Sequence, residues 1–328
     1  MTIDVDPSEP GALEPGALDP APLELGPQSR SDDPFTARMR LHQSWYRRDV
    51  LGVPHGCGPQ PGSRSPYGNM LRPEEAARGL NFTSPAAFTV ARARLADRRG
   101  TVEPFRLLHN LLSSQPMCFN LFGPLALDLD LATRLARASW PWVGRVTAVH
   151  VEHAPEPAAE HLADRTAFDV FLEVDDARGA PGFIGIEAKL TEPFSQKRYD
   201  TPAYRRWSED PAGPWLPSAR DALPRVEHNQ LWRDHLLAVA MLGHTTSPYT
   251  HGRLVVLHHP SDPRCRAVIA GYNALVRPGH EVAAIDVAQL LSAWRTVAPD
   301  ARWIEESRVR YVDLARSEPA WRSLGGRR

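Results

Sequence analysis

The stretch RTAFDVFLEVDDARGAPGFIGIEAKL, residues 165–190, decides the fold. It contains two mainly apolar runs, 168–174 and 184–190, separated by a Gly-, Pro- and Asp-rich break at 175–182. Each run has the length of a strand, and the break has the composition of a turn. Because side chains alternate between the two faces of a strand, both runs place apolar residues on one face. The sequence therefore predicts a hairpin that buries one apolar surface.

On the opposite face of this hairpin, the alternation places Asp169, Glu187 and Lys189 beside one another. Carboxylates that lie close together repel unless a cation or a proton lies between them. Their hard oxygens suit Mg²⁺, which keeps several waters and is commonly shared with substrate phosphates. A neighbouring lysine can orient or deprotonate an attacking water and stabilise charge on the phosphate. The hairpin thus indicates metal-dependent phosphodiester chemistry or, as the alternative, an ordinary hairpin with a solvated polar face.

At these residues the chain resembles a known family. Asp169 followed by Glu187-Ala188-Lys189, each at a strand position, resembles the PD-(D/E)XK nuclease superfamily, which has the restriction-endonuclease-like fold. The resemblance covers about residues 35–270. It implies an α/β core with a mixed central sheet flanked by helices, in which Asp169 and Glu187 hold the metal and Lys189 assists the attacking water. Three longer segments resemble one bacterial branch of the superfamily: NLLSSQPMCFNLFGPL (110–125), DRTAFD (164–169) and GFIGIEAKLTEPFS (182–195).

The resemblance also implies two supporting residues and contains one departure. Superfamily members usually supply a further acidic residue from an element before the Asp strand, and Glu152 fits as this additional metal ligand, with Glu103 and Glu173 as alternatives. Gln230 begins the helix after the E-x-K strand, where several members carry a residue that helps hold the substrate or the active-site water. Phe168 stands where the proline of the motif would be, a position that varies within the superfamily.

Composition places the chain among globular proteins. Its 328 residues suffice for a sizeable core, and 42% are hydrophobic and 23% charged. No run has the apolar length of a membrane span, and the N-terminus lacks the layout of a signal peptide. Three widely spaced cysteines argue against a disulfide framework. We therefore expect a cytoplasmic protein with no membrane partner.

Charge and composition also divide the chain. Residues 1–33 form a Pro/Gly/acidic near-repeat with eight acidic side chains and one basic one, which predicts a disordered tail. Residues 34–328 carry a net charge of +6, as a DNA-binding enzyme would. We expect a helical extension over 34–124, packed on a nuclease-like α/β core with C-terminal helices over 125–328.

The order of the expected elements supports this core. Gln115-Pro116 predicts a helix break, and MCFNLFG, 117–123, an apolar connection. Three antiparallel strands would form a meander, with a later strand added through a helical crossover. Outside the hairpin, strands are expected at 145–153, 253–260 and 282–286, and helices at 35–48, 85–98, 103–114, 125–138, 225–243, 264–275, 287–295 and 303–316.

The Pro-rich segment 191–224 predicts a long loop that carries Lys197, Arg198, Arg205 and Arg206 among aromatic residues. Loops of this length are usually functional or disordered, and the aromatic residues argue against disorder. We expect these cations to hold the DNA backbone without reading its sequence. A cover packed over the core by its tryptophans is the alternative.

Histidines offer a different metal site. His150, Glu152, His153 and His161 could in principle form a zinc cluster. Strand alternation places His153 opposite Glu152, and the spacing of an HExxH-type motif is missing. The sequence therefore favours the carboxylate site over a histidine site.

The function expected from these residues is hydrolysis of DNA phosphodiester bonds with Mg²⁺, for which Mn²⁺ could substitute. DNA is the expected partner, and a homodimer would allow both strands to be cut. Two alternatives use no metal chemistry: a nucleic-acid-binding module on a nuclease fold, and a scaffold in which the hairpin's charged residues form a structural ion-pair cluster.

Overall fold

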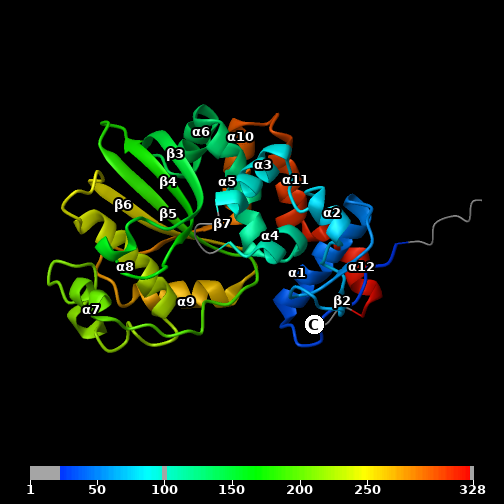
Figure 1. Ribbon diagram of the computed structural model, residues 1–328, viewed down its shortest axis with the longest axis horizontal. Helices are drawn as coiled ribbons and strands as arrows, with labels where there is room; N and C mark the ends of the chain where they lie inside the picture. The colour runs from blue at the N-terminus through cyan, green and yellow to red at the C-terminus, as the bar shows by residue number, and fades with distance from the viewer. Residues whose placement is uncertain (1–22, 98–101, 326–328) are drawn as a thin grey trace, which may run out of the picture.

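The computed structural model describes residues 23–97 and 102–325. In this part of the chain a five-stranded sheet has the order β3-β4-β5-β6-β7 (Figure 1). The first three strands form an antiparallel meander, and the last two are added in parallel, so the expected mixed sheet is confirmed. The strands are β3 Val143–His153, β4 Phe168–Asp176, β5 Pro181–Lys189, β6 His251–His258 and β7 Ala283–Asp286. A separate short pair consists of β1 Gly56–Cys57 and β2 Pro66–Tyr67.

Helices cover both faces of this sheet (Figure 1). The face of β4 and β5 that the sequence predicts to be apolar packs into one core cluster through Val170, Leu172, Ile184 and Ile186. The helices over this face are α5 Ser114–Leu127, α6 Leu129–Ser139 and α10 Val287–Val297, with α3 Pro85–Asp97 packed on α5.

The opposite face of the sheet is also buried. Phe171 and Phe183 pack with Trp232 into a second core cluster on that side. The alternative of a solvated polar face is therefore wrong for the middle of the hairpin, because helices pack across it. The helices on this side are α7 Pro202–Ser208, α8 Asn229–Gly243 and α9 Pro263–Asn273.

Helix α5 is the largest departure from the sequence prediction. The sequence predicts a break at Gln115-Pro116 followed by a connection, but α5 runs without interruption over both. Pro116 lies in the first helical turn, where a missing N–H costs no intrahelical hydrogen bond. The Ser113 hydroxyl caps this turn by accepting the N–H of Gln115 at 3.2 Å. The expected division at residue 124 therefore falls inside one helix that packs on the sheet.

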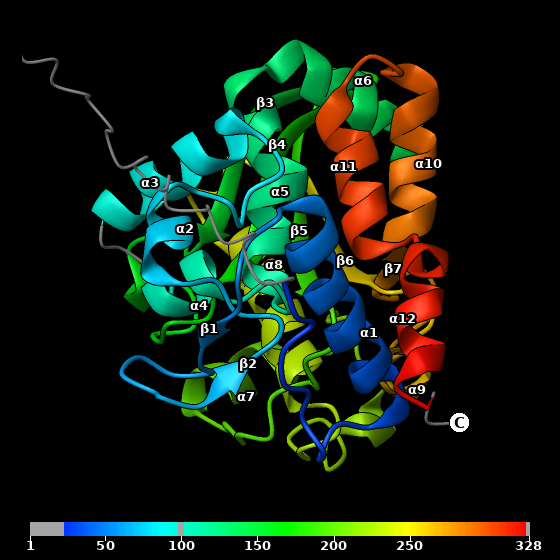
Figure 2. The same cartoon turned by 90° about the vertical axis from the view of Figure 1, so that its right-hand side faces the viewer.

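The N-terminal helices pack against the C-terminal ones (Figure 2). In α1, Arg38 Nη1 donates to Ser317 Oγ at 2.7 Å, and His42 Nε2 lies 2.9 Å from the carbonyl of Val309. The expected helical extension is thus joined to the end of the chain. Its helices are α1 Pro34–Trp45, continued by a π-helical turn Tyr46–Val50, α2 Pro73–Ala77 and α4 Pro104–His109, and the C-terminal helices are α11 Arg302–Tyr311 and α12 Glu318–Ser323.

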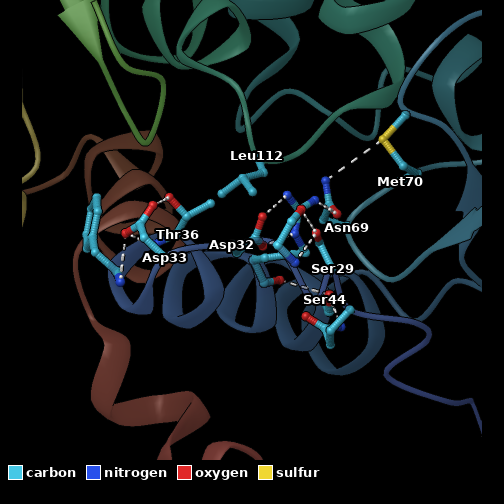
Figure 3. A network of polar contacts seen from close by, with 12 residues as sticks. Ser29, Asp32, Asp33, Thr36, Ser44, Asn69, Met70 and Leu112 are labelled. Atoms are coloured by element: carbon cyan, nitrogen blue, oxygen red, sulfur yellow. Dashed lines mark hydrogen bonds and ion pairs between the residues drawn. The ribbon is translucent and has the colours of Figure 1, made fainter. Parts of the chain in front are cut away.

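Residues 23–33 correct the prediction of a disordered tail. Asp32 forms a bidentate ion pair with Arg40, with N–O distances of 2.5 and 3.0 Å. Asp33 is the N-cap of α1 (Figure 3). The buried Arg47 donates to the carbonyl of Glu24 at 2.5 Å. These long-range contacts order a segment whose composition alone indicates disorder. Residues 1–22 of the predicted tail lie outside the described residues.

No helix within residues 23–97 and 102–325 combines the length and apolar character needed to cross a membrane.

Candidate active site

The sheet brings Asp169, Glu187 and Lys189 together. Asp169 lies at the start of β4, and the other two lie at the end of the antiparallel β5, so all three meet at one end of these two central strands. Asp169 Oδ2 accepts the backbone N–H of Ala188 at 2.7 Å, which fixes its carboxylate against the E-x-K segment. The hairpin therefore brings the three residues together, but strict alternation fails beside Asp169, because Phe168 packs with Phe171 and not on the face of Val170.

Glu187 and Lys189 form a buried ion pair. Lys189 Nζ lies 2.8 Å from Glu187 Oε1, and the two side chains are 8% and 7% exposed. The ammonium also lies 5.0 Å from the centroid of the Phe194 ring. Two charges removed from water to this degree require close pairing and additional hydrogen bonds. This burial argues against the solvated-hairpin alternative for these two residues.

Gln230, at the start of α8, supplies those hydrogen bonds. Its Oε1 accepts the backbone N–H of Ser195 at 2.7 Å and lies 3.3 Å from Lys189 Nζ. Because the oxygen is engaged by these donors, the amide nitrogen must face the carboxylate, and Nε2 donates to Glu187 Oε1 at 2.5 Å. One side chain thus holds both members of the ion pair.

The electrostatics of the group indicate an excess of negative charge. Burial raises the pKa of Asp169 well above its usual value, and Glu187 and Glu152 raise it further against the opposing effect of Lys189. Burial alone would lower the pKa of Lys189, but Glu187 and Asp169 outweigh it and raise that pKa overall. The lysine is therefore a firmly held ammonium, and one ammonium does not neutralise the carboxylates around it.

Of the three acidic residues considered as a further ligand, the structure brings only Glu152 to this group. Glu103 is used as the N-cap of α4. Glu173 pairs with His150 at 3.1 Å. Glu152 is 4% exposed and close enough to Asp169 to raise its pKa.

The donor set fits a hard divalent cation held by few protein ligands. Within residues 23–97 and 102–325, no group of three or more His, Cys, Asp or Glu side chains is arranged to hold a metal ion. Among the described residues, this finding gives no support to the zinc alternative, and none to Asp169, Glu187 and Glu152 as a set of three direct ligands. Asp169 and Glu187 offer two carboxylates, and Mg²⁺ is commonly held by one or two carboxylates with waters and substrate phosphate completing its shell. A cation there would also relieve the repulsion that raises the pKa of Asp169.

The comparison with protein families agrees with this geometry. A family model for the PD-(D/E)XK nuclease superfamily matches residues 30–313. The chain belongs to the PD-(D/E)XK nuclease superfamily. No curated protein and no solved structure matches it. The match extends beyond the expected 35–270 and includes α1 and α11. The N-terminal helical extension therefore lies within the region that matches the family.

Glu152 does not lie where strand alternation predicts. The pattern places it on the face of His150 and opposite His153, but the rings of these histidines lie 5.1 Å apart and His153 stacks on Phe171 at 4.4 Å. The cause is the backbone of Glu152, whose φ of 60° interrupts the alternation. Its carboxylate instead meets α5, where Oε1 accepts from Gln115 Nε2 at 2.8 Å.

The sequence analysis did not identify two further acidic residues near this group, Glu192 and Asp234. Glu192 ties the end of β5 to the start of α5, since Oε1 accepts the Ser114 N–H at 2.8 Å and Oε2 accepts two N–H groups after Lys189 at 3.2 Å. Asp234 is 4% exposed, and burial followed by Glu187 raises its pKa. Its position four residues after Gln230, on the same face of a helix, was the signal that could have identified it.

The basic loop is more structured than predicted, since α7 forms within it. Arg205 is paired with Asp200 through contacts of 2.7 and 2.5 Å, and Arg206 lies over an adjacent tryptophan ring. Lys197 and Arg198 are exposed and follow directly after the segment that contacts Gln230. These two cations are the ones of the predicted four that the structure leaves most open to a ligand.

Proposed function

We propose that this protein is a nuclease that hydrolyses phosphodiester bonds of DNA with the help of a divalent cation. The observation that carries the proposal is the group formed by half-buried Asp169 and the buried Glu187 and Lys189, in which Gln230 holds the ion pair. A structural ion pair would need one acid and one base. This group adds the second, repelled carboxylate of Asp169, whose burial is costly without a cation. A catalytic role for this group explains that energetic cost better than a structural role does.

Asp169 and Glu187 would hold the cation, with Mg²⁺ the expected ion and Mn²⁺ able to substitute. When bound, the cation would neutralise charge on the phosphate and acidify a bound water. Glu152 would add negative charge beside Asp169. Gln230 would keep the Glu187 carboxylate turned toward the group, because its amide holds one of the two oxygens.

Lys189 would hold the attacking water and stabilise the negative charge that develops on the phosphate oxygens. Its raised pKa supports the role of a charged donor over that of a proton acceptor. The choice of lysine is itself informative, because only Lys189 and Lys197 among the 38 basic residues of the chain are lysines. A structural ion pair would suit the forked guanidinium of arginine, whereas a compact ammonium leaves room for water and substrate.

The backbone of the DNA would lie along the segment that follows β5. Lys197 and Arg198 are exposed there, next to the residues that contact Gln230. Contacts of this kind neutralise phosphates without reading bases. A second copy of the chain, in a homodimer, would be needed for concerted cutting of both strands.

The test is cleavage of supercoiled plasmid and of labelled single-stranded DNA with Mg²⁺, Mn²⁺ or chelator. The wild type should cut only with metal, and Lys189→Met should lose cutting while remaining folded. Arg145→Met, which removes an exposed ion pair with Asp175, is the matched control and should cut like the wild type. Nicked plasmid as the only product would argue against a dimer. DNA binding without metal-dependent cutting by the wild type would reject the nuclease in favour of a binding module.

A further inference from the structure

Glu152 has an unusual backbone. It is one of two non-glycine residues with positive φ in the described part of the chain, and it lies within β3. A left-handed backbone conformation is strained for any residue other than glycine. Such a conformation persists only where surrounding contacts determine it. The contacts that hold Glu152 in this conformation therefore indicate its role.

One of these contacts comes from α5. Gln115 is 8% exposed, and its Oε1 accepts the backbone N–H of Glu103 at 3.3 Å. With its oxygen engaged, the amide nitrogen faces Glu152 and donates to Oε1 at 2.8 Å. Gln230 is anchored in the same way, with its oxygen on a backbone N–H and its nitrogen on Glu187. Two glutamines on different helices thus each direct an N–H at one carboxylate of the group.

A second contact comes from α3. Arg94 Nη2 donates to the backbone carbonyl of Glu152 at 2.5 Å, while Nη1 pairs with Asp97 at 2.9 Å. The guanidinium therefore holds the main chain of Glu152, and the amide of Gln115 holds its side chain. Helices α3 and α5 pack against each other, so the two contacts belong to one rigid unit.

The carboxylate held in this way lies beside the candidate metal ligands. It raises the pKa of Asp169, after burial and Glu187. The buried thiol of Cys118, one turn after Gln115, has a raised pKa because of burial and then because of Asp169 and Glu152. The geometry agrees, because Val151 pairs with Val170 and His153 pairs with Phe168, so Glu152 lies across from Asp169 on the neighbouring strand.

We infer that Gln115 and Arg94 are positioning residues that turn Glu152 out of the side-chain alternation of its strand and hold its carboxylate beside the candidate metal site. The inference rests on the proposed function, since it assigns the turned carboxylate a purpose at that site. With regular alternation, the Glu152 side chain would share the face of His150 and Phe171, whereas α5 and its Gln115 pack on the other face of the sheet.

The test is calorimetric titration of the metal-free full-length protein with Mn²⁺. Outer partners of metal sites typically contribute 10- to 100-fold in affinity, so Gln115→Met should weaken Mn²⁺ binding by about 10-fold or more. Glu152→Gln should weaken it at least as much. In the double variant the loss should equal that of Glu152→Gln alone, because Gln115 acts only through Glu152.

Two control variants separate positioning from general destabilisation. Asn120→Leu removes buried hydrogen bonds to Tyr311 and Asn81 from the same helix, and should lower the unfolding temperature without changing Mn²⁺ affinity. Arg94→Met, which removes the donor to the Glu152 carbonyl, should weaken Mn²⁺ binding, whereas Arg92→Met on the exposed side of α3 should leave it unchanged.

The outcomes distinguish this inference from the proposed function. Mn²⁺ binding by the wild type with unchanged affinity in Gln115→Met overturns the inference alone, as do additive losses in the double variant or an equal loss in Asn120→Leu. Failure of the wild type to bind Mn²⁺ overturns the proposed function and the inference with it.

Discussion

Asp169→Asn should stabilise the metal-free protein at neutral pH. Burial, and then the charges of Glu187 and Glu152, raise the pKa of Asp169 well above its usual value of 3.8. Asparagine retains an oxygen that can accept the N–H of Ala188 but carries no charge. The substitution therefore removes the cost of ionising a buried carboxyl group while keeping its hydrogen bond.

The sign and size of the effect follow from proton linkage. Above a pH of 3.8 the aspartate of the unfolded chain is ionised, whereas folded Asp169 keeps its proton until the pH passes its raised pKa. The folded state binds more protons in this window, so the wild type's free energy of unfolding falls by about 1.4 kcal/mol per pH unit. The loss is complete when both states are ionised. The stability difference between Asp169→Asn and the wild type should therefore grow from near zero at about pH 4.

The assay is guanidinium unfolding with chelator at several pH values from about 4 to 7.5. Asp234→Asn is the matched control, because Asp234 is also buried with a raised pKa. Relative to the wild type, both variants should become more stable as the pH rises. Added Mn²⁺ should stabilise only the wild type and Asp234→Asn, because Asp169→Asn lacks one of the proposed ligands. Equal stability of Asp169→Asn and wild type across the range, or a lower stability of the variant at neutral pH, would refute the reasoning.

Three further outcomes are expected. Gln230→Leu should lose about 1–3 kcal/mol of stability, because it leaves buried Glu187 short of a donor, and should cut DNA at least 10-fold more slowly in a cleavage assay. Gly185→Ala should lose about 1–3 kcal/mol in thermal or guanidinium unfolding, since a Cβ there would lie 2.7 Å from an aromatic ring that packs on the strand. Lys197→Ala and Arg198→Ala should each weaken DNA binding uniformly across sequences and reduce the salt slope of log affinity by about 1, measured by fluorescence anisotropy. An unchanged salt slope would remove these two residues from the proposed interface.

The strands and the central group were predictable from the sequence because their signals are local. Alternation over two short runs separates Glu187 and Lys189 from the apolar face, and the antiparallel hairpin then places them next to Asp169. Gln230 was expected from the family resemblance, which implies a supporting residue at the start of the helix after the E-x-K strand, and its amide contacts Glu187. The family match over residues 30–313 agrees with the fold that these elements imply.

The features that were missed depend on contacts between distant segments. Pro116 suggests a helix break unless its place in the first turn of α5 is known, and α5 is too uniformly buried to show a periodic pattern. The turn at Glu152 is set by Gln115 and Arg94, which lie 37 and 58 residues away in the chain. The ordering of residues 23–33 likewise depends on arginines of α1 and the turn that follows it. No pattern within one segment could report these contacts.

The central claim is that Asp169 and Glu187 together hold a divalent cation. The most direct measurement is anomalous diffraction from crystals of the wild type and of Asp169→Asn soaked in Mn²⁺. The account predicts a strong anomalous peak between the carboxylates of Asp169 and Glu187 in the wild type and its loss in the variant. A wild-type peak at His150, His153 or His161, or no peak beside Asp169 in crystals that cleave soaked DNA, would contradict it.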